Sequence, residues 1–366
     1  MVGSYNSTVL QQLTADGAVL RCADTLSSLA PQLLIQRETN SSTNNKLCSY
    51  GVGVGVGWTM RWCCSFPRAL LLVLLLGWWG RSSGFKICSF KLQSLNSTKA
   101  ANKRVMYTLK RVVSRCDVCL LQGVKDPNGS VMKHLVTKLN SYDHQYQTVA
   151  SRSLGVNPND MQQYVFLYRK EIVSVSDRHQ YEGKGFARPP FMVRFKSSQT
   201  SVGDFVLVAV NTVPGRAVQE MDQLYDVFTD ISKRWKTETV MFLGNFNAGC
   251  SHMTRPKKKE IRLFTKKGFY WLIGDHVDTT ATDTTDCAYD RIVVHGMSFL
   301  KQVEPGTASV FNYAKTYQIK KMAAMRISEH FPIEVELKSS THLPQATPLL
   351  ILLSLSAFLL SGLAAL

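Results

Sequence analysis

The stretch "VMFLGNFNAGCSH", residues 240–252, begins like a buried strand and ends as a polar loop. Val240–Leu243 is continuously apolar, which is typical of a strand covered on both faces. The chain then breaks at Gly244 into small polar residues, and a loop in this place commonly carries chemistry. The loop is built like a hydrolase site. However, Asn245 and Asn247 are neutral amides, so the carboxylic acid expected in such a site is missing.

Strands and helices alternate on both sides of this stretch. The clearest helix covers 216–235, where apolar residues recur at three- and four-residue steps, and further helices are predicted at 101–115 and 130–140. This alternation favours a layered α/β sandwich within residues 85–340. The other predicted strands are "FKICSF", "DVCLLQ", "QYVFLYR", "FMVRF", "DFVLVAV", "YDRIVV" and "PIEVEL".

An apolar run near the amino terminus has the layout of a secretory signal. Residues 69–76, "ALLLVLLL", follow Arg61 and Arg68 and precede small residues. A basic region, a short apolar region and small residues before a cleavage point define a signal peptide, here residues 60–84. A buried core segment is the alternative. Residues 1–59 lack periodicity, so we interpret them as an artefactual or a disordered extension.

The carboxyl-terminal residues 341–366 combine a short polar spacer with an uncharged apolar tail. This order predicts removal of the tail in exchange for a glycosylphosphatidylinositol (GPI) lipid anchor, with Ser339, Ser340 and Thr341 as small candidates for the attachment site. A single membrane span is the alternative.

Charge and sequence motifs fit an extracellular protein. The formal net charge of +17 favours polyanionic partners such as DNA, glycosaminoglycan or anionic lipid, although solubility alone also explains it. Asn96 and Asn128 begin glycosylation motifs.

Five cysteines lie within residues 85–340. Cys88, Cys116 and Cys119 occur in apolar runs, so they are interpreted as buried thiols. Cys250 and Cys287 occur in loops and form the best candidate disulfide.

Several segments resemble the deoxyribonuclease I family, in the right order and over nearly all of residues 85–338. The apolar carboxyl terminus is similar to that of the membrane-anchored, deoxyribonuclease X-like branch. The resemblance implies a four-layer α/β sandwich of the endonuclease/exonuclease/phosphatase type, acting as a monomer. It also implies cleavage of DNA with Mg²⁺ or Mn²⁺, and Ca²⁺ in a structural role. The segments are "FKICSF", "YVFLYR", "QLYDVF", "GNFNAGCS", "DTTAT…CAYDRIVV" and "SEHFPIEVEL".

The chemistry of phosphodiester cleavage explains what such a site needs. Carboxylate oxygens hold a hard cation that neutralises the phosphate. Histidines oriented by carboxylates move the protons. Of nine family positions, four keep a suitable group: Asn247, Asp290, His330 and Glu329, which replaces an Asp.

The other five positions carry a different group, so active-site metal binding is expected to be weak or absent. Lys91 replaces an Asn on the first strand, and Gly123 replaces a metal-binding Glu on the second. Gln162 replaces a Glu, Asn211 replaces the general acid/base His, and Asn245 replaces an Asp.

Two cations are predicted to meet DNA. Arg188 matches a DNA-contacting Arg of the family, and the ammonium of Lys91 is expected to stand in partly for the missing metal. Alternatively, Lys91 pairs with Asp290 or Glu329, or points to solvent.

Three functions remain open. The first is a pseudo-nuclease that binds DNA or another polyanion at the cell surface. The second is an active endonuclease that works through Asp290, Glu329 and His330. The third is a decaying gene product, which the readable strands, helix faces and processing signals disfavour.

Overall fold

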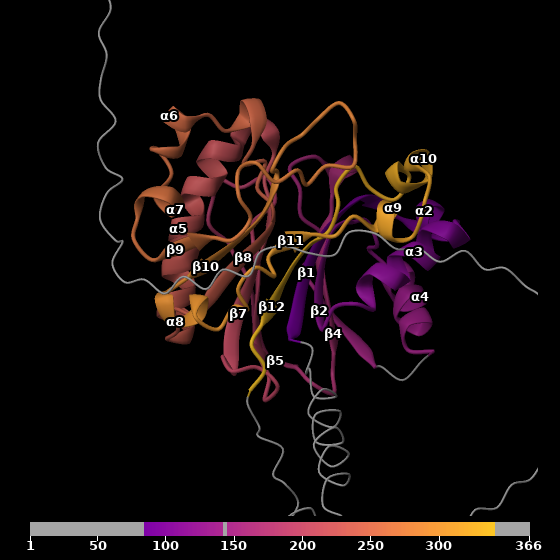
Figure 1. Ribbon diagram of the computed structural model, residues 1–366, viewed down its shortest axis with the longest axis horizontal. Coiled ribbons are helices and arrows are strands. Elements are labelled where there is room, and N and C mark those ends of the chain that lie inside the picture. The colour runs from indigo at the N-terminus through magenta and orange to yellow at the C-terminus, as the bar shows by residue number, and fades with distance from the viewer. Residues whose placement is uncertain (1–83, 142–144, 341–366) are drawn as a thin grey trace, which may run out of the picture. The chain divides into compact units, whose positions relative to one another are not determined.

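The computed structural model describes residues 84–141 and 145–340, in which two six-stranded sheets pack face to face (Figure 1). The strand order is β11-β12-β1-β2-β4-β3 in the first sheet and β5-β6-β7-β8-β10-β9 in the second. The strands are β1 (Phe85–Leu95), β2 (Val118–Val124), β3 (Tyr146–Ala150), β4 (Gln163–Arg169), β5 (Ser174–Gln180), β6 (Phe191–Lys196), β7 (Asp204–Asn211), β8 (Val240–Asn245), β9 (Phe269–Trp271), β10 (Asp290–His295), β11 (Ser309–Val310) and β12 (Ile333–Leu337).

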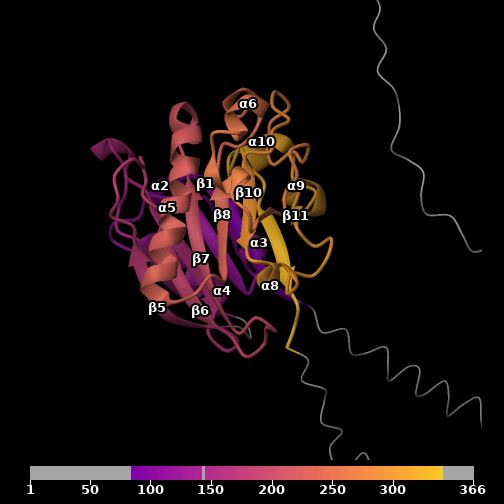
Figure 2. The same ribbon diagram turned by 90° about the vertical axis from the view of Figure 1, so that its left-hand side faces the viewer.

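Helices cover the outer face of each sheet, so the predicted four-layer sandwich is confirmed (Figure 2). The innermost apolar cluster joins the facing sides of the two sheets, and separate clusters bind α3 and α4 to the first sheet and α5 to the second. The helices are α2 (Ser97–Ala101), α3 (Lys103–Val113), α4 (Ser130–Leu139), α5 (Ala217–Trp235), α6 (Arg255–Lys258), α7 (Arg262–Thr265), α8 (Met297–Leu300), α9 (Tyr313–Thr316) and α10 (Lys321–Met325), with 3₁₀ turns η2 (Pro158–Asp160), η3 (Pro214–Arg216) and η4 (Cys250–His252).

Strand β8, which begins the stretch quoted at the start, lies inside the second sheet between β7 and β10. Every residue of β8 is buried, since β7 and β10 flank it and both sheet faces are covered. β7 and β8 run parallel, and β10 runs antiparallel to β8. The carboxyl ends of β7 and β8 and the start of β10 therefore meet at one edge of the sheet, where the polar residues lie.

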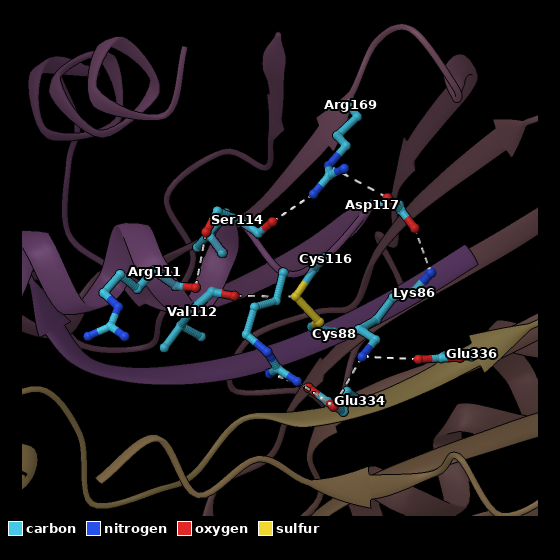
Figure 3. The surroundings of a disulfide bond; sticks show 12 residues. Lys86, Cys88, Arg111, Val112, Ser114, Cys116, Asp117, Arg169, Glu334 and Glu336 are labelled. Atoms are coloured by element: carbon cyan, nitrogen blue, oxygen red, sulfur yellow. Dashed lines mark hydrogen bonds and ion pairs between the residues drawn. A yellow bond between two sulfur atoms is a disulfide. The ribbon is translucent and has the colours of Figure 1, made fainter. Parts of the chain in front are cut away.

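Two disulfides cross-link the domain. Cys250 and Cys287 are joined, as predicted. The interpretation of Cys88 and Cys116 as free thiols is wrong, because they form a second disulfide (Figure 3). Cys88 on β1 and Cys116 in the turn after α3 lie 6.0 Å apart between Cα atoms, a distance that a disulfide spans. Cys119 is a buried free thiol.

Removing the disulfide that the sequence did not predict is expected to destabilise the protein substantially. Cys88 and Cys116 are separated by 28 residues. In the chain-entropy treatment, closing a loop of this length stabilises the fold by about 3.5 kcal/mol. We expect the double variant Cys88→Ala/Cys116→Ala to lose about that much free energy of unfolding in urea denaturation. If the double variant is as stable as the parent, the cross-link contributes nothing.

Several predictions lie outside the described residues. Of the predicted signal peptide at 60–84, only Gly84 is among the described residues. The extension at 1–59 and the anchor signal at 341–366 are entirely outside them. Among the helices of residues 84–141 and 145–340, none combines the length and apolar character that crossing a membrane requires.

Candidate functional site

Three neighbouring strands place predicted site residues at one level of the second sheet. In the β7–β8 ladder Asn211 is the partner of Asn245, and in the β8–β10 ladder Asn245 is the partner of Asp290. All three side chains are buried. The strand pairing thus brings together residues that are separated by up to 79 positions in the chain.

The amides at this level hydrogen-bond to one another. Asn245 Nδ2 donates to Asn211 Oδ1 at 3.2 Å, and the Asn247 backbone N–H donates to Asn245 Oδ1 at 3.3 Å. Asn247 Nδ2 donates to the Thr212 carbonyl at 2.8 Å and to its hydroxyl at 3.1 Å. Buried amides of this kind take hydrogen bonds from neighbouring protein groups. None of them can take up or release a proton in the physiological range.

One titratable pair is retained beside this network. His330 Nδ1 lies 2.5 Å from Asp290 Oδ2, and both side chains are largely buried. The hydroxyl of Thr279 accepts a hydrogen bond from the Asp290 backbone N–H at 3.1 Å, and Ser328 Oγ accepts one from the His330 N–H at 2.9 Å. An imidazole held by a carboxylate is oriented for proton transfer.

Lys91 lies next to the retained pair but binds neither acid. Ser328 Oγ donates to the Lys91 carbonyl at 2.6 Å, which joins β1 to the loop that carries His330. Within the described ranges Lys91 forms no ion pair with Asp290 or Glu329, and its side chain is half-buried rather than free in solvent. Burial lowers its pKa, although the negative charges of Asp290 and Glu329 oppose that effect.

Gly123 and Gln162 lie side by side on β2 and just before β4. Gln162 Oε1 is 3.7 Å from the point where a Cβ on residue 123 would lie. Gly123 has a positive φ of +75°, and an added Cβ there would collide with the carbonyl oxygen of Leu92. The backbone of β1 and β2 therefore fits a glycine at this position, not merely a residue without a carboxylate.

Substituting Gly123 is expected to be costly even with a small side chain. Gly306 has the same φ of +75° but no atom within 4 Å of its would-be Cβ, so it is a matched control. Both alanine variants carry the left-handed backbone penalty of about 1–2 kcal/mol. The collision with Leu92 should add roughly 1–3 kcal/mol to Gly123→Ala alone. Urea denaturation measures the difference, and equal losses would show that β1 accommodates a side chain freely.

Arg188 reaches the site through a carboxylate that the sequence did not single out. Asp160 in η2 pairs with the Arg188 guanidinium, lies 3.1 Å from Lys125 Nζ and accepts a hydrogen bond from Gln162 Nε2 at 2.9 Å. Partial burial raises the pKa of Asp160, but the hydrogen bonds from Gln162 and Lys125 and the charges of Arg188 and Lys125 hold it below its usual range. Asp160 thus links Gln162 to Arg188.

Two further basic residues near the site were not predicted. Lys99 on α2 donates to the Gln93 carbonyl at 2.5 Å, and burial lowers its pKa to about 8, while the charge of Glu329 opposes the shift. Arg291 is almost fully buried and donates to the carbonyls of Ala248, Ile273 and Ala288. It ties the loop after β8 to the segments after β9 and before β10. Arg291 lies in the family segment "CAYDRIVV", which could have signalled it, whereas only its basic residue type could have signalled Lys99.

The donor set does not suit a catalytic Mg²⁺ or Mn²⁺ ion. These ions require several hard oxygen ligands, chiefly carboxylates. Here Asp290 is bonded to His330, Glu329 is exposed, and the neighbouring positions carry amides, a glycine and a lysine. Throughout residues 84–141 and 145–340, no three or more His, Cys, Asp or Glu side chains gather in a way that could hold a metal ion.

Comparisons with known proteins agree with this architecture. Residues 88–330 match the model of the Endonuclease/Exonuclease/phosphatase family. Deoxyribonuclease gamma of Homo sapiens is 40% identical over 281 residues, which cover 74% of this chain and 92% of that protein. Deoxyribonuclease-1-like 1 of Homo sapiens is 38% identical over 296 residues, which cover 80% of this chain and 96% of that protein.

A solved structure shows the same fold at low identity. An endonuclease/exonuclease/phosphatase family protein from Leptotrichia buccalis aligns with a TM-score of 0.50 at 13% identity, covering 69% of this chain and 99% of that one. The fold is thus shared with proteins of this family whose sequences have diverged widely.

Proposed function

The chain belongs to the endonuclease/exonuclease/phosphatase family, and within it to the deoxyribonuclease I family, and from this membership we propose that it binds DNA or another polyanion without cutting it. The protein would act as a monomeric pseudo-nuclease at the cell surface.

The observation that carries the proposal is the buried hydrogen-bond network of Asn211, Asn245 and Asn247. Asn211 and Asn245 occupy positions where the family resemblance implies a general acid/base His and an Asp. Asn245 donates to Asn211 in a buried position, and neither amide can activate water or protonate a leaving oxygen. Loss of one positioned acid or base slows an enzyme by roughly 10²–10⁴.

The retained pair gives the second candidate, an active endonuclease. His330 and Asp290 keep the geometry of an oriented general base. Without a metal to neutralise the phosphate and without a second proton-transfer group, that pair completes only part of the reaction. We therefore favour binding over cleavage.

Cations around the retained pair support polyanion binding. Lys91 contributes positive charge near Asp290 and Glu329, and Lys99 does so near Glu329, where the family would hold a metal. Arg188 lies near Lys91, although Asp160 pairs with it. Lysine is a compact point charge that binds phosphate. Lys91 thus supplies part of the attraction that a divalent ion would otherwise supply. Because the pKa values of Lys91 and Lys99 are lowered, this attraction depends on pH.

Binding of DNA should be independent of divalent metal. We expect the affinity for a labelled duplex, measured by fluorescence anisotropy, to survive EDTA and to fall with rising salt. Lys91→Ala should weaken it roughly two- to fivefold, whereas Lys236→Ala, which removes an exposed cation beyond α5, should not. Loss of binding in EDTA, or equal affinity of Lys91→Ala and the parent, would contradict the proposal.

The pKa of Lys99 predicts a weakening of DNA binding in alkali. Burial has lowered the pKa to about 8, so the ammonium deprotonates between about pH 7 and pH 9 instead of near 10.5. Because the charged form attracts phosphate, affinity should fall roughly two- to fivefold across that interval. In Lys99→Arg the charge persists, since arginine titrates above pH 12. Anisotropy titrations should then show a flatter pH dependence; identical profiles would rule Lys99 out.

We also infer passage through the secretory pathway and a lipid anchor on the extracellular face of the plasma membrane. The disulfides and the motifs beginning at Asn96 and Asn128 support an oxidising, glycosylating compartment. Phosphatidylinositol-specific phospholipase should release the protein from cells. Retention of the protein with its apolar tail still attached would favour a single membrane span instead.

A further inference from the structure

A groove on the helix-covered outer face of the first sheet uses none of the residues of the site described above. It lies between α3, the end of α4 and residues 317–327, which include α10, and it has a volume of about 960 Å³. Figure 1 shows these helices on the same side of the sheets. The Tyr317 hydroxyl donates to the Arg111 carbonyl at 3.1 Å, which fixes one wall to the other.

The lining of the groove exposes more apolar than polar surface, and it includes several basic side chains but no acidic one. Lys103, Arg104 and Arg326 are exposed and form no ion pair with any described residue. Unpaired cations gathered along one groove create a positive potential that attracts polyanions. The lining cations are Lys103, Arg104, Lys110, Arg111, Lys138 and Arg326.

Aromatic rings lie among these cations. The Arg111 guanidinium lies 3.6 Å from the ring centre of Tyr317 and 5.7 Å from that of Tyr107. Tyr107 is 61% exposed, although it stands on a helix whose other apolar side chains are buried. A positive groove with an exposed aromatic ring combines phosphate attraction with a surface for stacking bases.

We propose that this groove binds single-stranded DNA, with phosphates at Lys103, Arg104 and Arg326 and a base stacked on Tyr107. A strand with unpaired bases can lay one on an aromatic ring, whereas the bases of a duplex are already stacked inside the helix. The proposal shares its class of ligand with the proposed function but uses none of the same residues.

The groove also begins next to the site. Ala100 lines the groove, and the preceding residue in α2, Lys99, lies close enough to Glu329 for its pKa to respond to that charge. At the other wall, α10 leads directly to Ser328 and His330.

The test measures binding of a labelled single-stranded oligothymidine and a labelled duplex to the purified protein in EDTA. Tyr107→Ala should weaken single-strand binding at least about fivefold, the effect of losing one stacked base, and leave duplex binding unchanged. Arg104→Ala should weaken single-strand binding and reduce its salt slope by about 0.7. Lys233→Ala, which removes an exposed cation from α5, is the matched control and should change neither.

Three results would overturn the groove proposal. They are unchanged single-strand binding in Tyr107→Ala, an equal loss in Lys233→Ala, and loss of binding to phosphatidylserine vesicles in Tyr107→Ala while single-strand binding persists. The proposed function fails separately, if Lys91→Ala leaves duplex binding unchanged while the groove variants behave as expected.

Discussion

Returning the family's groups to all five replaced positions should produce Mg²⁺-dependent plasmid cutting that the unmodified protein lacks. The restored His and Asp can transfer protons, which the two amides cannot. Each positioned group should raise the rate by roughly 10²–10⁴. The restored Glu side chains supply the carboxylate oxygens that Mg²⁺ prefers. Conversion of supercoiled plasmid to nicked circles measures the gain. The changes are Lys91→Asn, Gly123→Glu, Gln162→Glu, Asn211→His and Asn245→Asp.

A variant with four of the changes, keeping Gly123, is the matched control. It lacks one metal ligand and should cut at least about tenfold more slowly than the variant with all five. The five-change variant should also be less stable than the parent, because a side chain at residue 123 meets the Leu92 carbonyl. If that variant folds and binds DNA but does not cut in Mg²⁺ or Mn²⁺, the replaced groups do not explain the missing chemistry.

Replacing Arg291 should destabilise the protein more than replacing any exposed arginine. Its guanidinium is 1% exposed and donates to three backbone carbonyls at 2.7–2.8 Å and to Asp275 at 2.9 Å. Arg291→Met leaves those buried carbonyls unpaired, which should cost about 3–5 kcal/mol of unfolding free energy. Thermal unfolding should show a fall of roughly 10 °C in Tm.

Arg262→Met is the control that tests whether burial, rather than the number of hydrogen bonds, sets the loss of stability. Arg262 binds both carboxylate oxygens of Asp222 and also pairs with Asp226, but its side chain is 31% exposed. Water can solvate the acids that the variant leaves behind, so the loss should be about 1 kcal/mol. Equal destabilisation by both variants would mean that the buried carbonyls find other partners.

The layers of the fold could be predicted because their strands and helices carry strong apolar patterns. β7 and β8 contain continuous apolar runs at 205–210 and 240–243, and α5 repeats its apolar residues at helical spacing. β5 was missed because it is an edge strand whose residues are mostly polar and partly exposed, so it shows no such pattern. Its place depends on pairing with β6, which a local pattern does not encode.

The site was predictable in its residue types but not in its contacts. Family motifs located Asn211, Asn245 and His330, yet the amide network depends on how the strands align. The Cys88–Cys116 disulfide likewise depends on where α3 returns the chain to β1. Asp160 lies in a polar turn with no motif of its own.

The most direct test of the account is Mg²⁺-dependent nicking of supercoiled plasmid by the unmodified, purified protein, with human deoxyribonuclease gamma measured alongside it. The buried amides of Asn211 and Asn245 predict no nicking above the level seen in EDTA. The EDTA-resistant DNA affinity of the same preparation shows that the protein is folded and able to bind. Nicking at a rate within about tenfold of the relative's would contradict the account, because one lost proton-transfer group alone should cost more than that.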